Sequence, residues 1–163
     1  MRIGGDPAVG EEGEVIEADA ARDPALAQSL ERFVVAQANH YAAALAEIRA
    51  GAKRTHWMWF IFPQLAGLGR SDAARYYAIR SLREAQACLR HPLLGARYLE
   101  CVSELQDLPG NDPEAIFGPL DAIKLRSSLT LFEAARPLTL FEAALARWFG
   151  GKADPQTVAL LGG

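Results

Sequence analysis

The stretch from His56 to Gln64 reads HWMWFIFPQ and concentrates aromatic and apolar side chains between two polar ends. Indole and phenyl rings offer stacking area to a planar ligand, while a histidine and an amide supply directional polar contacts. We therefore predict a small-molecule site here, with four candidate contacts: His56, Trp57, Trp59 and Gln64. The alternative is a core segment threaded between helices, because side chains of these types are usually buried.

Cationic side chains and a glycine-bearing loop flank this stretch. Lys53 precedes it, and the loop GLGRS of residues 67–71 follows it and leads into a predicted helix. Free N–H groups and the helix dipole at such a position favour an anion, so Lys53, Gly69 and Ser71 are candidate anion contacts. The third glycine of a dinucleotide fingerprint is missing, and no strand-helix-strand unit surrounds the loop. The alternative is an ordinary loop whose serine caps the helix.

A third cluster combines Lys124 with Ser127 and Ser128, which helical spacing places on neighbouring positions of one face. A lysine there could activate a serine or hold a phosphate or carboxylate group. The alternative is a solvated lysine, with serine hydroxyls bonded back to the helix. If the protein is an enzyme, His56 is the candidate general acid or base, because histidine titrates near neutral pH, and Lys124 is the second catalytic candidate.

No metal site and no cofactor are predicted, because the histidines and cysteines lack metal-ligand spacing. Cys88 and Cys101 are expected to be reduced, partly buried thiols of a cytoplasmic protein. A disulfide between them is the alternative. The glutamates on helical segments are interpreted as exposed helix faces: Glu47, Glu84, Glu100 and Glu104.

The charge is unevenly distributed along the 163 residues. The net charge is −3, and residues 1–22 hold six acidic and two basic side chains, a net of −4, which leaves +1 for the remainder. A near-neutral body gives no electrostatic case for a nucleic-acid or membrane partner. The longest apolar run, residues 57–62, is too short to cross a bilayer, and the N-terminus lacks the apolar region of a signal peptide. We expect a flexible acidic tail over residues 1–22, a single helical domain over residues 23–163, and a cytoplasmic location.

Helix start and stop signals dominate the body of the chain. Asp23-Pro24, Ser71, Ser81 and Asp112-Pro113 are typical N-terminal caps, and Gly51 and Gly150 are typical stops. Together with apolar residues at helical spacing they predict an all-α fold of about seven to nine mostly short helices. The predicted helices cover residues 24–50 with a break near residues 39–40, then 72–79, 82–91, 92–105, 113–117, 120–135, 139–149 and 155–161.

Motifs spread along residues 26–161 together resemble one bacterial family, the domain of unknown function family 1810. These motifs are HWMWFIFPQ, GLGRS at 67–71, YAI at 77–79, HPLLG at 91–95, IFG at 116–118 and KLRSSLTLF at 124–132. The resemblance implies a compact helical domain and brings no established activity. Some members carry the label "calpastatin", which implies a protease inhibitor, but the chain has no inhibitor repeats.

A fainter resemblance, over residues 37–41 and 84–95, is to the NADAR-type N-glycosidases, which act on ADP-ribose-like or ribosyl compounds. Their Trp-Asp catalytic surroundings are not matched in this sequence.

The sequence therefore leaves two candidate functions of different class. One is a pocket that binds, and in an enzyme acts on, a small anionic nucleotide- or ribosyl-like ligand; the other is a helical module for protein interaction.

Overall fold

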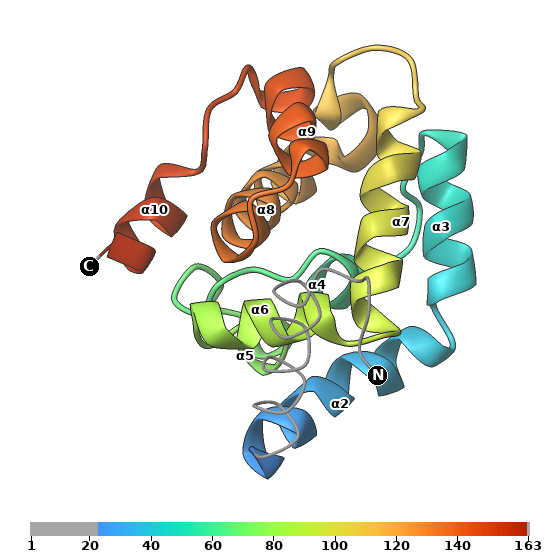
Figure 1. Cartoon of the computed structure of the whole chain (residues 1–163). Helices are drawn as coiled ribbons and strands as arrows, with labels where there is room; N and C mark the ends of the chain where they lie inside the picture. The colour runs from blue at the N-terminus through green and yellow to red at the C-terminus, as the bar shows by residue number, and fades with distance from the viewer. Residues whose placement is uncertain (1–22, 163) are drawn as a thin grey trace, which may run out of the picture.

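The computed structural model describes residues 23–162, and the predicted acidic tail lies outside the described residues. The described part folds into helices and contains no strand, which confirms the predicted all-α class (Figure 1). The nine helices are α2 (Pro24–Ala38), α3 (Tyr41–Ala50), α4 (Met58–Ile61), α5 (Asp72–Tyr76), α6 (Leu82–Arg90), α7 (Leu94–Gln106), α8 (Pro113–Ala135), α9 (Thr139–Phe149) and α10 (Pro155–Gly162).

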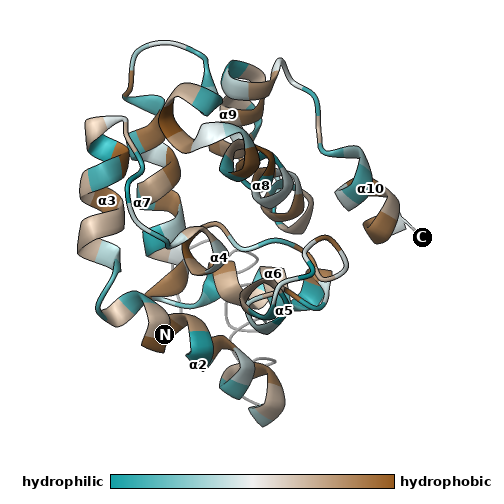
Figure 2. Ribbon diagram, turned by 180° about the vertical axis from the view of Figure 1, so that it is seen from behind, coloured by the Kyte–Doolittle hydropathy of each residue, from teal (hydrophilic) through white to brown (hydrophobic). Residues whose placement is uncertain are grey.

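Helix α8 is the longest and packs against α6, α9 and α10. Helix α7 lies beside α3 and also contacts α6 and α9, while α2 runs along one end of the molecule against α4 and α6 (Figures 1 and 2). Apolar residues of all these helices face one another in a continuous core, because burial of their side chains is the main force that holds short helices together. The short helix α4 contacts both α2 and α8, which places the aromatic stretch between two larger elements.

The cap signals in the sequence mark most helix ends correctly. The Asp23 and Ser81 side chains accept hydrogen bonds from Leu26 N and Glu84 N at 3.0 Å. Gly51 ends α3 with a left-handed φ of 71°, a conformation that glycine adopts without a steric penalty. The break predicted after Phe117 is a kink inside α8 at Gly118, where φ is 79°.

One predicted helix end differs from the structure. The helix that follows Ser71 ends at Tyr76 instead of Ile79, because Ile79 N donates to Gln64 O and Ile79 O accepts from Ala66 N, both at 2.8 Å. These bonds form an isolated parallel β-bridge between Leu65 and Ile79 that competes with the last helical turn.

The two thiols agree with their prediction: Cys88 and Cys101 are free and buried, and burial raises the pKa of each to about 12.

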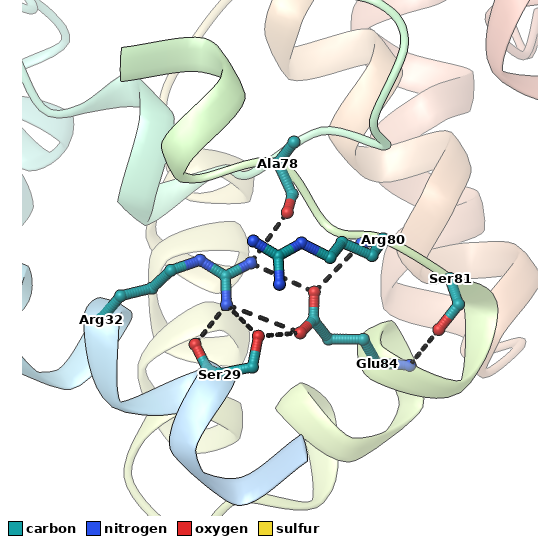
Figure 3. Close-up of polar contacts among 6 residues, drawn as sticks. All are labelled: Ser29, Arg32, Ala78, Arg80, Ser81 and Glu84. Carbon is teal, nitrogen blue, oxygen red and sulfur yellow. Dashed lines mark hydrogen bonds and ion pairs between the residues drawn. The ribbon is translucent and has the colours of Figure 1, made fainter. Parts of the chain in front are cut away.

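The prediction that Glu84 lies on an exposed helix face is wrong. Its side chain is 4 % exposed and forms an ion pair with Arg32, with 3.1 Å between Arg32 Nη2 and Glu84 Oε1 (Figure 3). The carboxylate also accepts from Arg80 N at 3.0 Å and from the Ser29 hydroxyl, and Arg32 Nη2 donates to Ala78 O at 2.8 Å. Burial acts to raise the pKa of Glu84, but the bonds to Arg32, Ser29 and Arg80 outweigh it and lower the pKa. The pair ties α2 to α6.

None of the described helices has both the length and the apolar character that a membrane crossing requires.

Candidate functional site

The aromatic stretch adopts a short helical turn, α4, and buries most of its side chains. Trp57 caps the turn and is 1 % exposed, and Phe60, Ile61 and Phe62 are also buried. Trp59 differs because it is only partly buried and lies at the edge of the core. The core interpretation therefore holds for most of the stretch, and one tryptophan, Trp59, remains partly accessible.

Glu47 at the end of α3 organises the loop that leads into this turn. Its carboxylate accepts four hydrogen bonds: from Arg54 N at 2.6 Å, from Thr55 N at 2.9 Å, from the Thr55 hydroxyl at 2.7 Å and from Trp57 Nε1 at 3.0 Å. Partial burial acts to raise the pKa of Glu47, but these bonds outweigh it and lower the pKa to about 2. The interpretation of Glu47 as an exposed helix face missed this role, since the partners come from a loop outside the helix.

We expect Glu47→Gln to lower the free energy of unfolding by about 2 kcal/mol at pH 7, after a discount for its partial exposure. The folded pKa lies below the ordinary value of 4.5, so the stabilisation is present above pH 4.5 and is lost as the pH falls towards 2. Urea unfolding at pH 7, 5, 4 and 3 should therefore show the wild type converging on the variant. Glu104→Gln is the matched control, because Glu104 forms only a partly exposed pair with Arg49; a pH-independent difference for Glu47→Gln would contradict the assignment.

Lys53 and Lys124 converge on one carboxylate that the sequence analysis did not single out, Asp121. Lys53 Nζ lies 2.9 Å from Asp121 Oδ2, and Lys124 Nζ lies 3.4 Å from Asp121 Oδ1. A backbone bond from Lys53 N to Ile116 O at 2.9 Å brings the loop to α8 and makes this arrangement possible. The Lys124–Asp121 pair has helical i,i+3 spacing and was readable from the sequence. The pairing with Lys53 depends on the tertiary fold.

The two lysines have different surroundings. The Lys53 side chain is 8 % exposed, and its ammonium lies over the Trp57 ring at 5.1 Å and donates to Thr55 O at 2.6 Å. The Lys124 side chain is 29 % exposed, and its ammonium lies over the Trp59 ring at 5.2 Å. Lys53 is thus a largely buried structural cation, whereas Lys124 remains accessible beside Trp59.

His56 lies near Lys124, because both residues lie next to the Trp59 ring. The His56 and Trp59 ring centroids are 6.4 Å apart, and His56 is exposed. Trp59 therefore contacts both predicted catalytic candidates, His56 and Lys124. We call His56, Trp59, Asp121 and Lys124 the Trp59 surface. The charged groups of this surface are the Lys124 ammonium and the Asp121 carboxylate, and the Lys53 ammonium lies behind them, so Lys53, Asp121 and Lys124 together carry a net charge of +1.

The remaining predicted site residues do not join this surface by any contact that we observe. Ser127 and Ser128 are buried; Ser127 Oγ donates to Ile123 O at 3.1 Å, as in the alternative interpretation, and Ser128 Oγ lies 2.9 Å from Tyr98 Oη. Ser71 Oγ accepts from Ala74 N at 3.1 Å and caps a helix of only five residues.

Gly69 and Gln64 have structural surroundings in the same loop region. A Cβ atom at Gly69 would approach Ala74 Cβ to 2.4 Å, which explains the glycine by close packing. Gln64 contributes its backbone carbonyl to the bridge with Ile79. The structure gives both residues a packing or backbone role, and we leave them outside the Trp59 surface.

A separate hollow of about 390 Å³ lies between the end of α3, the loop of residues 108–112 and the first turn of α8. Its lining includes Gly51, Leu108 and Ile116 and none of the predicted site residues. Within residues 23–162 we find no group of three or more histidine, cysteine, aspartate or glutamate side chains that could hold a metal ion. The Trp59 surface offers cations and an indole ring, a set suited to an organic anion.

Comparison with known proteins gives a consistent result. Residues 27–161 match the family model described as "Protein of unknown function (DUF1810)". The chain is also similar to the crystal structure, at 1.38 Å, of the conserved hypothetical protein Rv1873 from Mycobacterium tuberculosis. The identity is 52 % and the TM-score 0.80, over 82 % of this chain and 96 % of that chain. No curated protein matches.

Proposed function

This chain belongs to the family of proteins of unknown function DUF1810, as its motifs predicted, and from its geometry we propose that the Trp59 surface binds a small anionic ligand with a planar ring. The nucleotide- and ribosyl-like compounds are the class that combines these two features. The observation that carries the proposal is that two lysines share the single carboxylate of Asp121 beside an accessible indole.

Lys124 is the contact for the anionic group in this proposal. An ammonium has three N–H donors, and in the described part of the chain Lys124 has an ion pair only with Asp121, at 3.4 Å. Its other donors are available to a ligand oxygen. Lys53 is satisfied by Asp121 and Thr55, and it acts by preventing Asp121 from neutralising Lys124 completely.

Trp59 and His56 supply the other contacts. The indole provides stacking area for a planar ring, and the exposed imidazole provides a hydrogen-bonding group next to it. If the bound ligand reacts, His56 is the group in this surface with the chemistry of a general acid or base. Trp57, Ser127 and Ser128 are buried, so they are not ligand contacts in this proposal.

The proposal is tested by a thermal-shift screen against nucleotides, NAD, ADP-ribose, sugar phosphates and small organic acids. A ligand at a hundred times its dissociation constant adds about 2.7 kcal/mol of stability, a readable shift. We expect at least one compound to bind, and Lys124→Ala and Trp59→Leu to weaken its binding about tenfold or more, measured by titration calorimetry. Lys152→Ala is the matched control because Lys152 is an exposed lysine elsewhere. Equal affinity in all three variants would contradict the proposal.

A protein-interaction module is the second candidate, and one observation favours it. Leu120 and Ile123, next to Asp121 and Lys124 on α8, are 74 % and 59 % exposed. Exposed aliphatic side chains beside cations are typical of surfaces that bind partner proteins. A Leu120→Ser/Ile123→Ser variant separates the two functions, since it should leave small-ligand affinity unchanged and should weaken the binding of a partner protein.

A further inference from the structure

The motif HPLLG at residues 91–95 forms the joint between α6 and α7, and the proposed function does not use it. His91 N donates to Ala87 O at 2.9 Å and closes the last turn of α6. Gly95, in the first turn of α7, lies so close to α6 that a Cβ atom at this position would be 2.0 Å from Leu89 O. The two helices therefore meet in a tight turn, with backbone against backbone (Figure 1).

The His91 side chain caps the helix that follows. Its Nδ1 accepts hydrogen bonds from Leu93 N at 3.1 Å and from Leu94 N at 3.2 Å. A ring nitrogen that accepts a hydrogen bond carries no proton, so the imidazole is neutral with its hydrogen on Nε2. Leu93, at the N-cap position of α7, has an aliphatic side chain and cannot take over this role. One imidazole thus satisfies two amides at the start of a 13-residue helix.

Protonation of His91 removes this cap. It places an N–H group opposite two N–H donors, and it adds a positive charge at the positive end of the dipole of α7. Burial of the imidazole lowers the pKa of His91 below its ordinary value of 6.5, and the Glu31 carboxylate on α2, which favours the charged form, does not offset this effect. The cations nearest in sequence are Arg90 on α6 and Arg97 on α7, and the Arg97 guanidinium lies over the Tyr41 ring at 4.5 Å.

We propose that His91 is an acid-sensitive latch: the neutral imidazole holds the joint between α6 and α7 closed, and its protonation releases the first turn of α7. Because the pKa of His91 is lower in the closed joint than in an open chain, the stabilisation is present above pH 6.5 and is lost as the pH falls below that value. Cys88 precedes His91 by three residues on α6 and is buried, so an open joint exposes its thiol. This inference does not depend on ligand binding at the Trp59 surface.

The test measures how fast 4,4′-dithiodipyridine, a disulfide that also reacts with thiols in acid, labels Cys88 in the full-length chain. In His91→Asn the amide oxygen can accept from the same two N–H groups but does not titrate, whereas His91→Ala has no acceptor at any pH. We expect the wild type to react like His91→Asn at pH 7.5 and about fivefold faster than His91→Asn at pH 5, the size of a lost cap. His91→Ala should react about fivefold faster than His91→Asn at both pH values.

His40→Asn is the matched control, because His40 lies at another helix joint, between α2 and α3, where its ring nitrogen bonds to Ala36 O at 2.8 Å. It should leave the pH response of Cys88 unchanged. Cys101, buried further along α7 with its Sγ 3.8 Å from Tyr41 Oη, is the internal reference, and mass spectrometry of the labelled peptides separates the two thiols.

A ratio of wild-type to His91→Asn labelling rates that is the same at pH 7.5 and pH 5 would overturn the proposal. Equal acceleration of Cys88 and Cys101 in acid would overturn it too, because that result indicates unfolding of the whole chain. Loss of the response in His40→Asn would assign it to the other histidine. If His91→Ala does not fold, the comparison of the wild type with His91→Asn decides the outcome alone.

Discussion

Replacing Glu84 with alanine is expected to lower the free energy of unfolding by about 3–5 kcal/mol, because it leaves the Arg32 guanidinium as a buried charge without a counterion. The Arg32 side chain is only 7 % exposed, so water cannot replace the lost carboxylate. The same carboxylate holds Arg80 N and the Ser29 hydroxyl, and these bonds are lost with it. Urea unfolding at pH 7, followed by circular dichroism, measures the effect.

The control for this prediction removes both charges. Arg32→Met/Glu84→Leu fills the space with apolar side chains and should recover most of the lost stability, since burying two paired ions has a desolvation cost that apolar residues avoid. Arg49→Ala breaks the partly exposed pair with Glu104 and should cost less than about 1 kcal/mol. A loss of less than about 1 kcal/mol in Glu84→Ala would show that the Arg32–Glu84 pair is accessible to water.

Replacing Trp57 with alanine is expected to cost about 3–5 kcal/mol, whereas Trp59→Ala should cost less than half as much and remain folded. Trp57 is 1 % exposed, packs its ring against Phe62 and Phe117 at centroid distances of 6.3 and 6.2 Å, and donates to Glu47. Trp59 is only partly buried and loses mainly its contacts with His56 and Lys124.

Urea unfolding of the two single variants at equal protein concentration measures this difference. Trp57→Phe serves as the conservative control: it retains most of the apolar ring but cannot donate to Glu47, so it separates packing from the hydrogen bond. Equal losses in Trp57→Ala and Trp59→Ala would contradict the distinction between a core tryptophan and a surface tryptophan.

The sequence by itself determined the helices and the family. Caps, glycine stops and proline positions act over three or four residues, so they could be interpreted without knowledge of the fold. The break near residues 39–40, the stop at Gly51 and the kink at Gly118 were all predicted in this way. The aromatic stretch consists mostly of apolar side chains, and this composition predicted burial for most of its residues.

Only the tertiary structure decided which polar groups meet. Arg32 and Glu84 are 52 residues apart, and each alone looks like an exposed helix residue until α2 packs against α6. Lys53 and Asp121 likewise join a loop to a helix that is distant in sequence. The four bonds to Glu47 form because the loop after α3 folds back onto the end of that helix. Trp57 and Trp59 are two positions apart and chemically identical, and only the contacts of α4 with α2 and α8 make one core and the other surface. Short-range sterics and capping are properties of the local sequence, whereas burial and ion pairing depend on what the rest of the chain brings alongside.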